Sequence, residues 1–131
     1  MTFIDEKTFS DCDNLYEYIV SSDNEYFISD NGVLFNKEKS VLIYYPAGKK
    51  DSSYTIPNTV ISIGQDAFCV CKMLTSVTIP NSVKSIGGRA FNGCSNLTKV
   101  NYLSSVDEWV EFDFIGPYYN PTYYAKDLYI N

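Results

Sequence analysis

The chain has 131 residues, of which 45% are hydrophobic, and this size and composition fit one folded domain. Its net charge is -6, and its ten Lys and Arg residues are scattered along the sequence. A nucleic-acid-binding surface needs clustered basic side chains, so no nucleic-acid partner is expected. No apolar run reaches the roughly 18 to 20 residues of a membrane-spanning helix, and no membrane insertion is expected in this chain.

The first 20 residues are predicted to form a partial repeat unit. Four of their apolar residues have the same mutual spacing as four residues near the middle of the chain: Ile4, Phe9, Cys12 and Leu15 match Ile63, Phe68, Cys71 and Leu74. A strand is therefore expected over residues 16–20. Because the match begins within a unit, we expect the chain to be a fragment or a shortened form of a longer repeat array.

Residues 21–52 are predicted to form an inserted β-meander. Three apolar runs, at 26–28, 33–35 and 41–45, are separated by an Asn-Gly turn signal and by a charged segment. Short apolar runs joined in this way are typical of antiparallel strands. We expect the meander to pack on the repeat units or to extend them.

Residues 53–100 contain two full repeat units. The stretch Thr55–Val77 is repeated in register by Thr78–Val100, which gives a period of 23 residues. In each unit apolar side chains alternate with small polar ones, as in Ser-Val-Thr-Ile at 76–79, and Pro80 follows. This alternation predicts a strand with one buried face that ends at the proline.

Units of this length leave their apolar residues exposed unless they stack on one another. The sequence therefore predicts a mainly β solenoid, with one parallel strand per unit and short helical or turn segments between strands. The paired strands are expected over residues 16–20, 53–56, 75–79 and 98–102. Cys12, Cys71 and Cys94 occupy one position of the unit and are predicted to be buried free thiols, whereas Cys69 is expected to be more exposed.

Residues 101–131 are predicted to form a C-terminal cap. The segment 104–110 has the pattern of a short helix, with Ser at its N-cap and acidic residues in its first turn. Residues 127–131 resume strand alternation and are expected to add a last strand. Three aromatic side chains, those of Trp109, Phe112 and Phe114, would cover the final hydrophobic face of the solenoid.

The segment Leu74–Leu97 closely resembles the BspA-like leucine-rich repeat, also called the Treponema pallidum type. Its Ile-Pro, Ile-Gly, Ala-Phe and Cys elements have the spacing of that family, and they occur twice in full and once in part. The resemblance implies a leucine-rich-repeat solenoid. It also implies a cell-surface or secreted protein of a host-associated bacterium that serves in adhesion, although no signal peptide is visible in this chain. It implies no catalytic residues.

Candidates for chemistry are few. The chain has no histidine, which excludes Ser-His-Asp and Cys-His catalysis and the commonest zinc ligand. Paired carboxylates would serve as the acid and base of a carbohydrate-active enzyme, and four lie close together in sequence: Asp107, Glu108, Glu111 and Asp113. A solvated acidic surface explains them more simply. No enzyme activity, cofactor or metal site is predicted.

We expect a non-catalytic module that binds a protein or a glycan. The expected partner face consists of the outward strand positions Glu17, Ser53, Thr55, Ser76, Thr78, Lys99 and Asn101. A candidate aromatic patch consists of Tyr118, Tyr119, Tyr123 and Tyr124, for which packing within the cap is the alternative. The competing functions are a structural spacer in a larger surface protein and, more remotely, the carbohydrate-active enzyme. Exposed aromatics on the strand face would favour binding, and uniformly small polar residues would favour the spacer.

Overall fold

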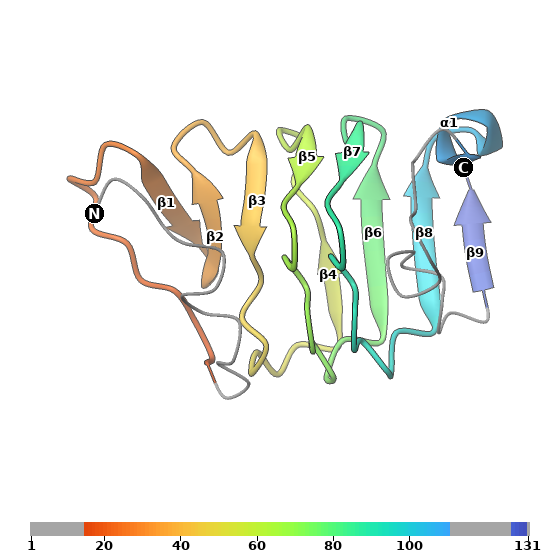
Figure 1. Ribbon diagram of the computed structural model, residues 1–131, viewed down its shortest axis with the longest axis horizontal. Helices are drawn as coiled ribbons and strands as arrows, with labels where there is room; N and C mark the ends of the chain where they lie inside the picture. Colours follow the sequence, from red (N-terminus) through yellow and green to blue (C-terminus); the bar gives the residue numbers. More distant parts are fainter. Residues whose placement is uncertain (1–14, 111–126, 131) are drawn as a thin grey trace.

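The computed structural model describes residues 15–110 and 127–130, which form two β-sheets and one short helix (Figure 1). The first sheet, sheet A, has the order β1 (Phe27–Asp30), β2 (Val33–Asn36), β3 (Val41–Tyr44), β5 (Ser62–Ile63) and β7 (Ser85–Ile86). The second, sheet B, has the order β4 (Ser53–Thr55), β6 (Ser76–Pro80), β8 (Lys99–Leu103) and β9 (Asp127–Ile130). The helix is α1 (Val106–Val110). None of the described helical residues forms a segment long and apolar enough to cross a membrane.

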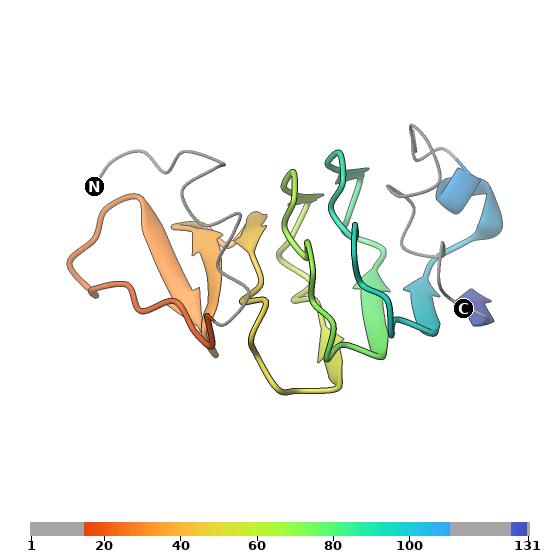
Figure 2. The same cartoon turned by 60° about the horizontal axis from the view of Figure 1, so that its bottom comes forward.

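Sheet B is a parallel ladder whose register follows the 23-residue period. Ser53 pairs with Ser76 and Ser76 pairs with Lys99, so residues at one position of the unit lie side by side. The same spacing holds in sheet A, where Ile63 pairs with Ile86. The chain passes from one sheet to the other in each unit, and Figure 2 shows the two sheets as opposite walls of one solenoid. The predicted solenoid is confirmed, and so are its strands in the two full units and the added last strand.

The strand predicted over residues 16–20 is wrong, because these residues have no regular secondary structure. The backbone N–H of Tyr18 donates to Gly32 O over 2.8 Å, and the N–H of Val20 donates to Ser29 Oγ over 3.1 Å. This segment is therefore held by the hairpin of β1 and β2 rather than by sheet B. The spacing that suggested a partial repeat depends mainly on residues 1–14, which lie outside the described residues.

The predicted meander is confirmed, and it extends the solenoid. Strands β1 and β2 pair antiparallel and are joined by Asn31 and Gly32, with φ of 53° and 81°, as a two-residue hairpin turn with two left-handed residues requires. Strand β2 pairs antiparallel with β3, and β3 then pairs in parallel with β5. Strand β3 thus occupies the place of the second strand of a repeat unit. The division of the chain at residues 20, 52 and 100 stays a prediction.

A column of aromatic rings runs through the core. The rings of Tyr45 and Phe68 are stacked with centroids 5.1 Å apart, and those of Phe68 and Phe91 are 4.8 Å apart. The three residues are buried and lie 23 positions apart in sequence. Because complete burial of such a side chain contributes about 1.5–3 kcal/mol, the column is a main source of cohesion between units.

Two of the three cysteines predicted at one position of the unit lie next to this column, and the third, Cys12, lies outside the described residues. Cys71 and Cys94 are buried free thiols, and Cys69 is partly exposed. The thiol of Cys94 donates to the carbonyl oxygen of Phe68 over 2.9 Å. The Sγ of Cys71 lies 3.9 Å from the carbonyl oxygen of Tyr45. The hydrogen bond with the Cys94 thiol and burial raise the pKa of Cys71 well above its usual range, so the Cys71 thiol stays protonated and acts as a small apolar residue.

Side-chain hydrogen bonds between neighbouring units have a common direction. In seven such bonds the donor belongs to the later unit and the acceptor to the earlier one. Thr75 Oγ1 donates to Ser52 O over 2.9 Å, and Asn96 Nδ2 donates to Lys72 O over 2.7 Å. The guanidinium of Arg89 donates to the buried carboxylate of Asp66 over 2.9 Å. Each unit therefore holds its predecessor through polar as well as apolar contacts.

The described part of the cap agrees with its prediction. The N–H of Glu108 donates to Ser105 Oγ over 3.2 Å, so Ser105 is the N-cap of α1. The Trp109 ring is buried, and its centroid lies 5.1 Å from that of the Tyr102 ring on β8. Trp109 thus covers the core as expected. Phe112 and Phe114 lie outside the described residues.

Candidate functional site

Six of the seven residues predicted for the partner face lie together on the outer side of sheet B. The strand pairing places them in two rows: Ser53, Ser76 and Lys99 form one, and Thr55, Thr78 and Asn101 form the other. The intervening Val77, Ile79, Val100 and Tyr102 are buried in the core. The alternation of the sequence therefore placed these six residues on one side of the sheet, because successive side chains of a strand point to opposite sides. Their contact with a partner stays a prediction.

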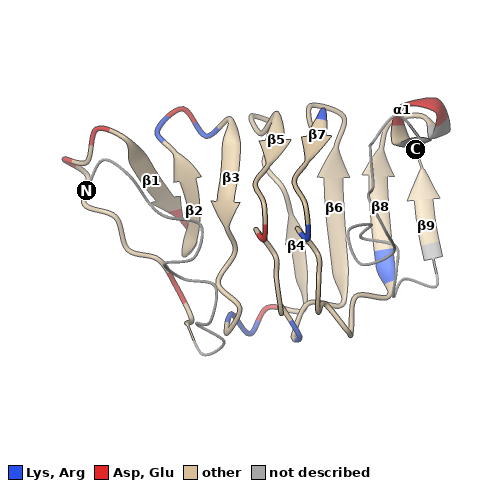
Figure 3. Ribbon diagram, viewed as in Figure 1, with Lys and Arg blue, Asp and Glu red and all other residues tan. Residues whose placement is uncertain are grey.

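The outer face changes character along the ladder. On β4 and β6 it carries small hydroxyl side chains, whereas β8 and β9 present larger groups. Figure 3 shows one basic position near the start of β8, where the strand begins with Lys99, and Asp127, the first residue of β9, pairs with Lys99 in the ladder. The Nζ of Lys99 lies 4.8 Å from the centre of the Tyr129 ring, a cation–π distance. Tyr129 and Leu103 are 45% and 41% exposed.

We call the set of Lys99, Asn101, Leu103 and Tyr129 the β8–β9 patch. Leu103 and Tyr129 were not predicted to belong to the partner face. The alternation of residues 99–103 could have indicated Leu103, which lies on the same side as Lys99. Tyr129 joins the face through its pairing with Asn101. Strand β9 comes after a stretch of sequence that does not follow the 23-residue repeat. No sequence signal therefore specifies how β9 pairs with β8.

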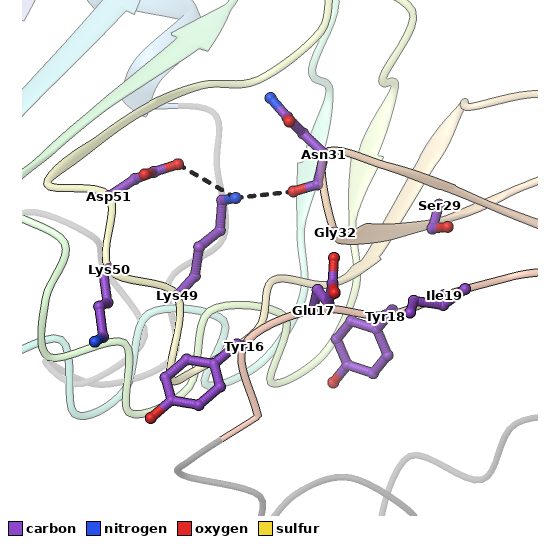
Figure 4. A pocket seen from close by; sticks show the side chains of 10 residues that line it. All are labelled: Tyr16, Glu17, Tyr18, Ile19, Ser29, Asn31, Gly32, Lys49, Lys50 and Asp51. Atoms are coloured by element: carbon purple, nitrogen blue, oxygen red, sulfur yellow. Dashed lines mark hydrogen bonds and ion pairs between the residues drawn. The ribbon is translucent and has the colours of Figure 1, made fainter.

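Glu17 does not lie on this face, because the strand expected to carry it does not form. It lines a pocket of about 540 Å³ at the other end of the solenoid, between the segment 16–19, the hairpin turn and the loop 49–51 (Figure 4). A Cβ atom at Gly32 would lie 2.8 Å from the Cβ of Glu17, so glycine is needed for this close approach. Its positive φ favours glycine as well. The tyrosine and lysine side chains of this pocket were not predicted as site residues.

The candidate aromatic patch of Tyr118, Tyr119, Tyr123 and Tyr124 lies outside the described residues. Of the four carboxylates considered for catalysis, Glu111 and Asp113 also lie outside them. The carboxylate of Glu108 lies 3.7 Å from the Nζ of Lys84, in an exposed ion pair. Such an exposed pair contributes little to stability.

The described residues offer no metal or nucleophile chemistry. They contain no group of three or more His, Cys, Asp and Glu side chains that could hold a metal ion. Burial and the nearby Asp66 carboxylate raise the pKa of Cys69, the one described cysteine that is partly exposed. A thiol must be deprotonated to act as a nucleophile, so the surroundings of Cys69 oppose that role.

Solved structures of other proteins share this fold. A leucine-rich repeat protein from Eubacterium ventriosum matches with a TM-score of 0.54 and 29% identity, covering 70% of this chain and 31% of its own. The pneumococcal vaccine antigen PcpA matches with a TM-score of 0.51 and 20% identity, covering 87% and 38%. A leucine rich cell surface protein from Faecalibacterium prausnitzii matches with a TM-score of 0.52 and 22% identity, covering 82% and 40%. The chain thus spans well under half the length of these three proteins.

The search of curated proteins finds no match. The model of the BspA type leucine rich repeat region, which comprises six copies, matches residues 43–117, more than half of the chain. The match begins within the segment predicted as an insertion, near the point where β3 and Tyr45 enter the ladder. With this match and the 23-residue parallel ladder, the chain belongs to the BspA-type leucine-rich repeat family.

Proposed function

We propose that the chain is a non-catalytic binding module of a bacterial surface protein, and that it contacts a protein partner through the β8–β9 patch. The observation that carries this proposal is the change along the outer face of sheet B. Small hydroxyl side chains on β4 and β6 give way to an exposed tyrosine, an exposed leucine and a lysine on β8 and β9. Tyr129, an exposed aromatic of the kind expected of a binding surface, thus lies at one end of the face.

The composition of the patch suits a protein interface. Tyrosine is enriched among the residues that dominate binding energy, and an apolar neighbour helps to exclude water around it. The side chains of Tyr129 and Leu103 project from strands that pair in parallel within one sheet. A backbone held in this way lowers the entropy lost on binding, because little of it has to be ordered by the partner.

The location at the cell surface is part of the proposal. It is supported by the family and by two of the similar structures, one described as a vaccine antigen and one as a cell surface protein. The similarity to these two proteins concerns the fold, and each is considerably longer than this chain.

A structural spacer is the second candidate, and one observation favours it. The outer positions of β4 and β6 are small polar residues at Ser53, Thr55, Ser76 and Thr78, and Pro80 ends the row. A spacer would need only such a surface, and it would bind no ligand through Tyr129 or Leu103.

The proposal is tested by applying the purified chain to an array of extracellular-matrix proteins and glycans. A protein ligand found there is then titrated against the double variant Tyr129→Ser/Leu103→Ser. We expect at least about tenfold weaker binding, because the variant removes the aromatic and apolar contacts. The matched control is Tyr26→Ser/Ile61→Ser, which alters two residues that are 49% and 54% exposed outside the patch. It should bind like the parent chain.

Two results would contradict the proposal. If no protein on the array binds, the spacer is favoured. If the control loses as much affinity as the patch variant, binding occurs elsewhere on the chain. Circular dichroism of both variants establishes that the comparison is made between folded proteins.

A further inference from the structure

The pocket that contains Glu17 is built by three segments tied to one another. The N–H of Tyr18 donates to Gly32 O, and the N–H of Gly48 donates to Leu15 O, each over 2.8 Å. The Nζ of Lys49 donates to Asn31 O over 2.8 Å and lies 3.2 Å from the carboxylate of Asp51. These bonds join the segment 16–19, the hairpin turn and the loop 49–51. The pocket is therefore formed before any ligand arrives.

Lys49 has a structural role in this pocket. Figure 4 shows its side chain reaching from the loop toward the hairpin turn, where its amine lies between Asp51 and the Asn31 carbonyl. Its side chain is only 15% exposed, and its charge is balanced by Asp51. Of the other charged groups that line the pocket, Glu17 is negative and Lys50 is positive, and both are exposed. The four charges of the lining sum to zero, so the pocket favours neither an anionic nor a cationic ligand.

Tyrosine supplies the apolar part of the pocket. The ring of Tyr16 is 58% exposed, and the Nζ of Lys50 lies 5.6 Å from its centre. In Figure 4 the side chains of Tyr16 and Tyr18 project from the segment to the same side, whereas Glu17 projects toward Gly32. The ring of Tyr18 stacks on that of Tyr44 with centroids 6.2 Å apart, which holds it in place.

We propose that this pocket is a second binding site of the protein and that it takes a neutral carbohydrate. The C–H face of a sugar ring packs on an aromatic ring, which Tyr16 provides. Sugar hydroxyls both donate and accept hydrogen bonds, and Lys50, whose amine lies beside the Tyr16 ring, offers a donor group. The volume of about 540 Å³ falls within the roughly 300–1,000 Å³ typical of small-molecule sites and accommodates one or two sugar rings.

This site is separate from the β8–β9 patch. The pocket lies beside the meander at the N-terminal end of the solenoid, and the patch lies on the last two strands of sheet B at the opposite end (Figure 1). A sugar in the pocket and a protein on the patch would not compete for the same residues. The two sites can therefore be tested independently.

The test is saturation-transfer nuclear magnetic resonance and calorimetry on the full chain. The neutral probes are maltose, lactose and diacetylchitobiose, and the anionic probes are sialyllactose and a heparin disaccharide. We expect at least one neutral probe to bind, with the strongest saturation on its ring C–H protons. Tyr16→Ala should weaken this binding at least about tenfold, and Tyr16→Phe should retain it because the ring remains.

The matched control is Tyr26→Ala, which removes a tyrosine that is 49% exposed and does not line the pocket. It should leave the affinity for the sugar unchanged, and so should Tyr129→Ser. The proposal is overturned if no neutral probe binds, if the anionic probes bind more tightly than the neutral ones, or if Tyr16→Ala and Tyr26→Ala behave alike. Failure of the protein-binding proposal would not affect these results, because it concerns Tyr129 and Leu103.

Discussion

The repeat array and the N-terminal meander share one core but determine their registers in different ways. In the array, contacts recur 23 residues later, so the pairing of Ser53 with Ser76 is repeated by Ser76 with Lys99. In the meander, the register of β1 and β2 depends on a single turn at Asn31 and Gly32. A periodic sequence thus specifies its neighbours many times over, whereas a hairpin depends on two residues.

The two regions meet in the aromatic column. Tyr45, which follows β3 of the meander, stacks on Phe68 of the array. Its N–H donates to Ala67 O over 2.8 Å, and the N–H of Phe68 makes the same bond to Ala90 O over 2.7 Å. The meander is therefore joined to the array by the contacts that the array uses internally. Substitutions in and near this column test how far the two regions depend on each other.

The largest effect is expected for Phe68→Ala. This residue is fully buried between Tyr45 and Phe91, and removal of such a side chain typically costs about 3–5 kcal/mol of unfolding free energy. Urea denaturation measures the loss. Since the column joins the regions, hydrogen exchange should become faster in both β2 and β6. Unchanged protection of β2 would show that the meander is stable without the array. Tyr26→Ala, at an exposed position, should change stability by less than about 0.5 kcal/mol.

A smaller loss of stability is expected for Gly87→Ala. A Cβ atom at Gly87 would lie 2.5 Å from the backbone nitrogen of Gln65 in the preceding unit, so the two units would have to move apart. Overpacking of this kind costs about 1–3 kcal/mol. The neighbouring Gly88 has open space around its Cβ position and serves as the control. Thermal unfolding measures the melting temperatures of the two variants. Equal melting temperatures would contradict the close approach of the units at Gly87.

The smallest change in stability is expected for Tyr45→Phe, and this variant should be more stable than the parent chain. The hydroxyl of Tyr45 is buried and has no hydrogen-bond partner among the described residues, and the equivalent residues of the array are phenylalanines. An unsatisfied buried polar group costs about 1–3 kcal/mol, so removing the hydroxyl should raise the unfolding free energy by about 1 kcal/mol. A measurable loss in urea denaturation would show that the hydroxyl has a partner.

The same variant has a signature at high pH. Burial, with smaller contributions from Cys71 and Asp51, raises the pKa of Tyr45 in the folded protein. The unfolded chain ionises this group near pH 10, so the stability that the neutral phenol contributes is complete below pH 10 and is lost above it. The parent chain should lose up to about 1.4 kcal/mol per pH unit more than Tyr45→Phe in this range. Parallel curves for the two proteins would contradict the raised pKa.

Most of the array could be predicted from the sequence because its determinants are local and repeated. Alternation placed Val77 and Ile79 in the core, and the period paired their strand with its neighbours. The site of the meander in the ladder had one overlooked signal, since Tyr45 lies 23 residues before Phe68. No sequence signal indicated the pocket, because it depends on the approach of Glu17 to Gly32, and the two segments share no sequence pattern. Tyr129 enters the outer face by a register that only the folded chain determines.

The direction of the side-chain hydrogen bonds between units has a consequence for how the protein is made. Because Thr75, Arg89, Cys94 and Asn96 all donate backward along the chain, a finished unit already displays the carbonyl and carboxylate oxygens that the following unit will need. Protein synthesis releases the N-terminal units first. Each unit emerging from the ribosome can therefore find acceptors for its side-chain donors on the unit made before it, while backbone N–H groups of that earlier unit, such as those of Ile56 and Phe68, find their acceptors on the new one.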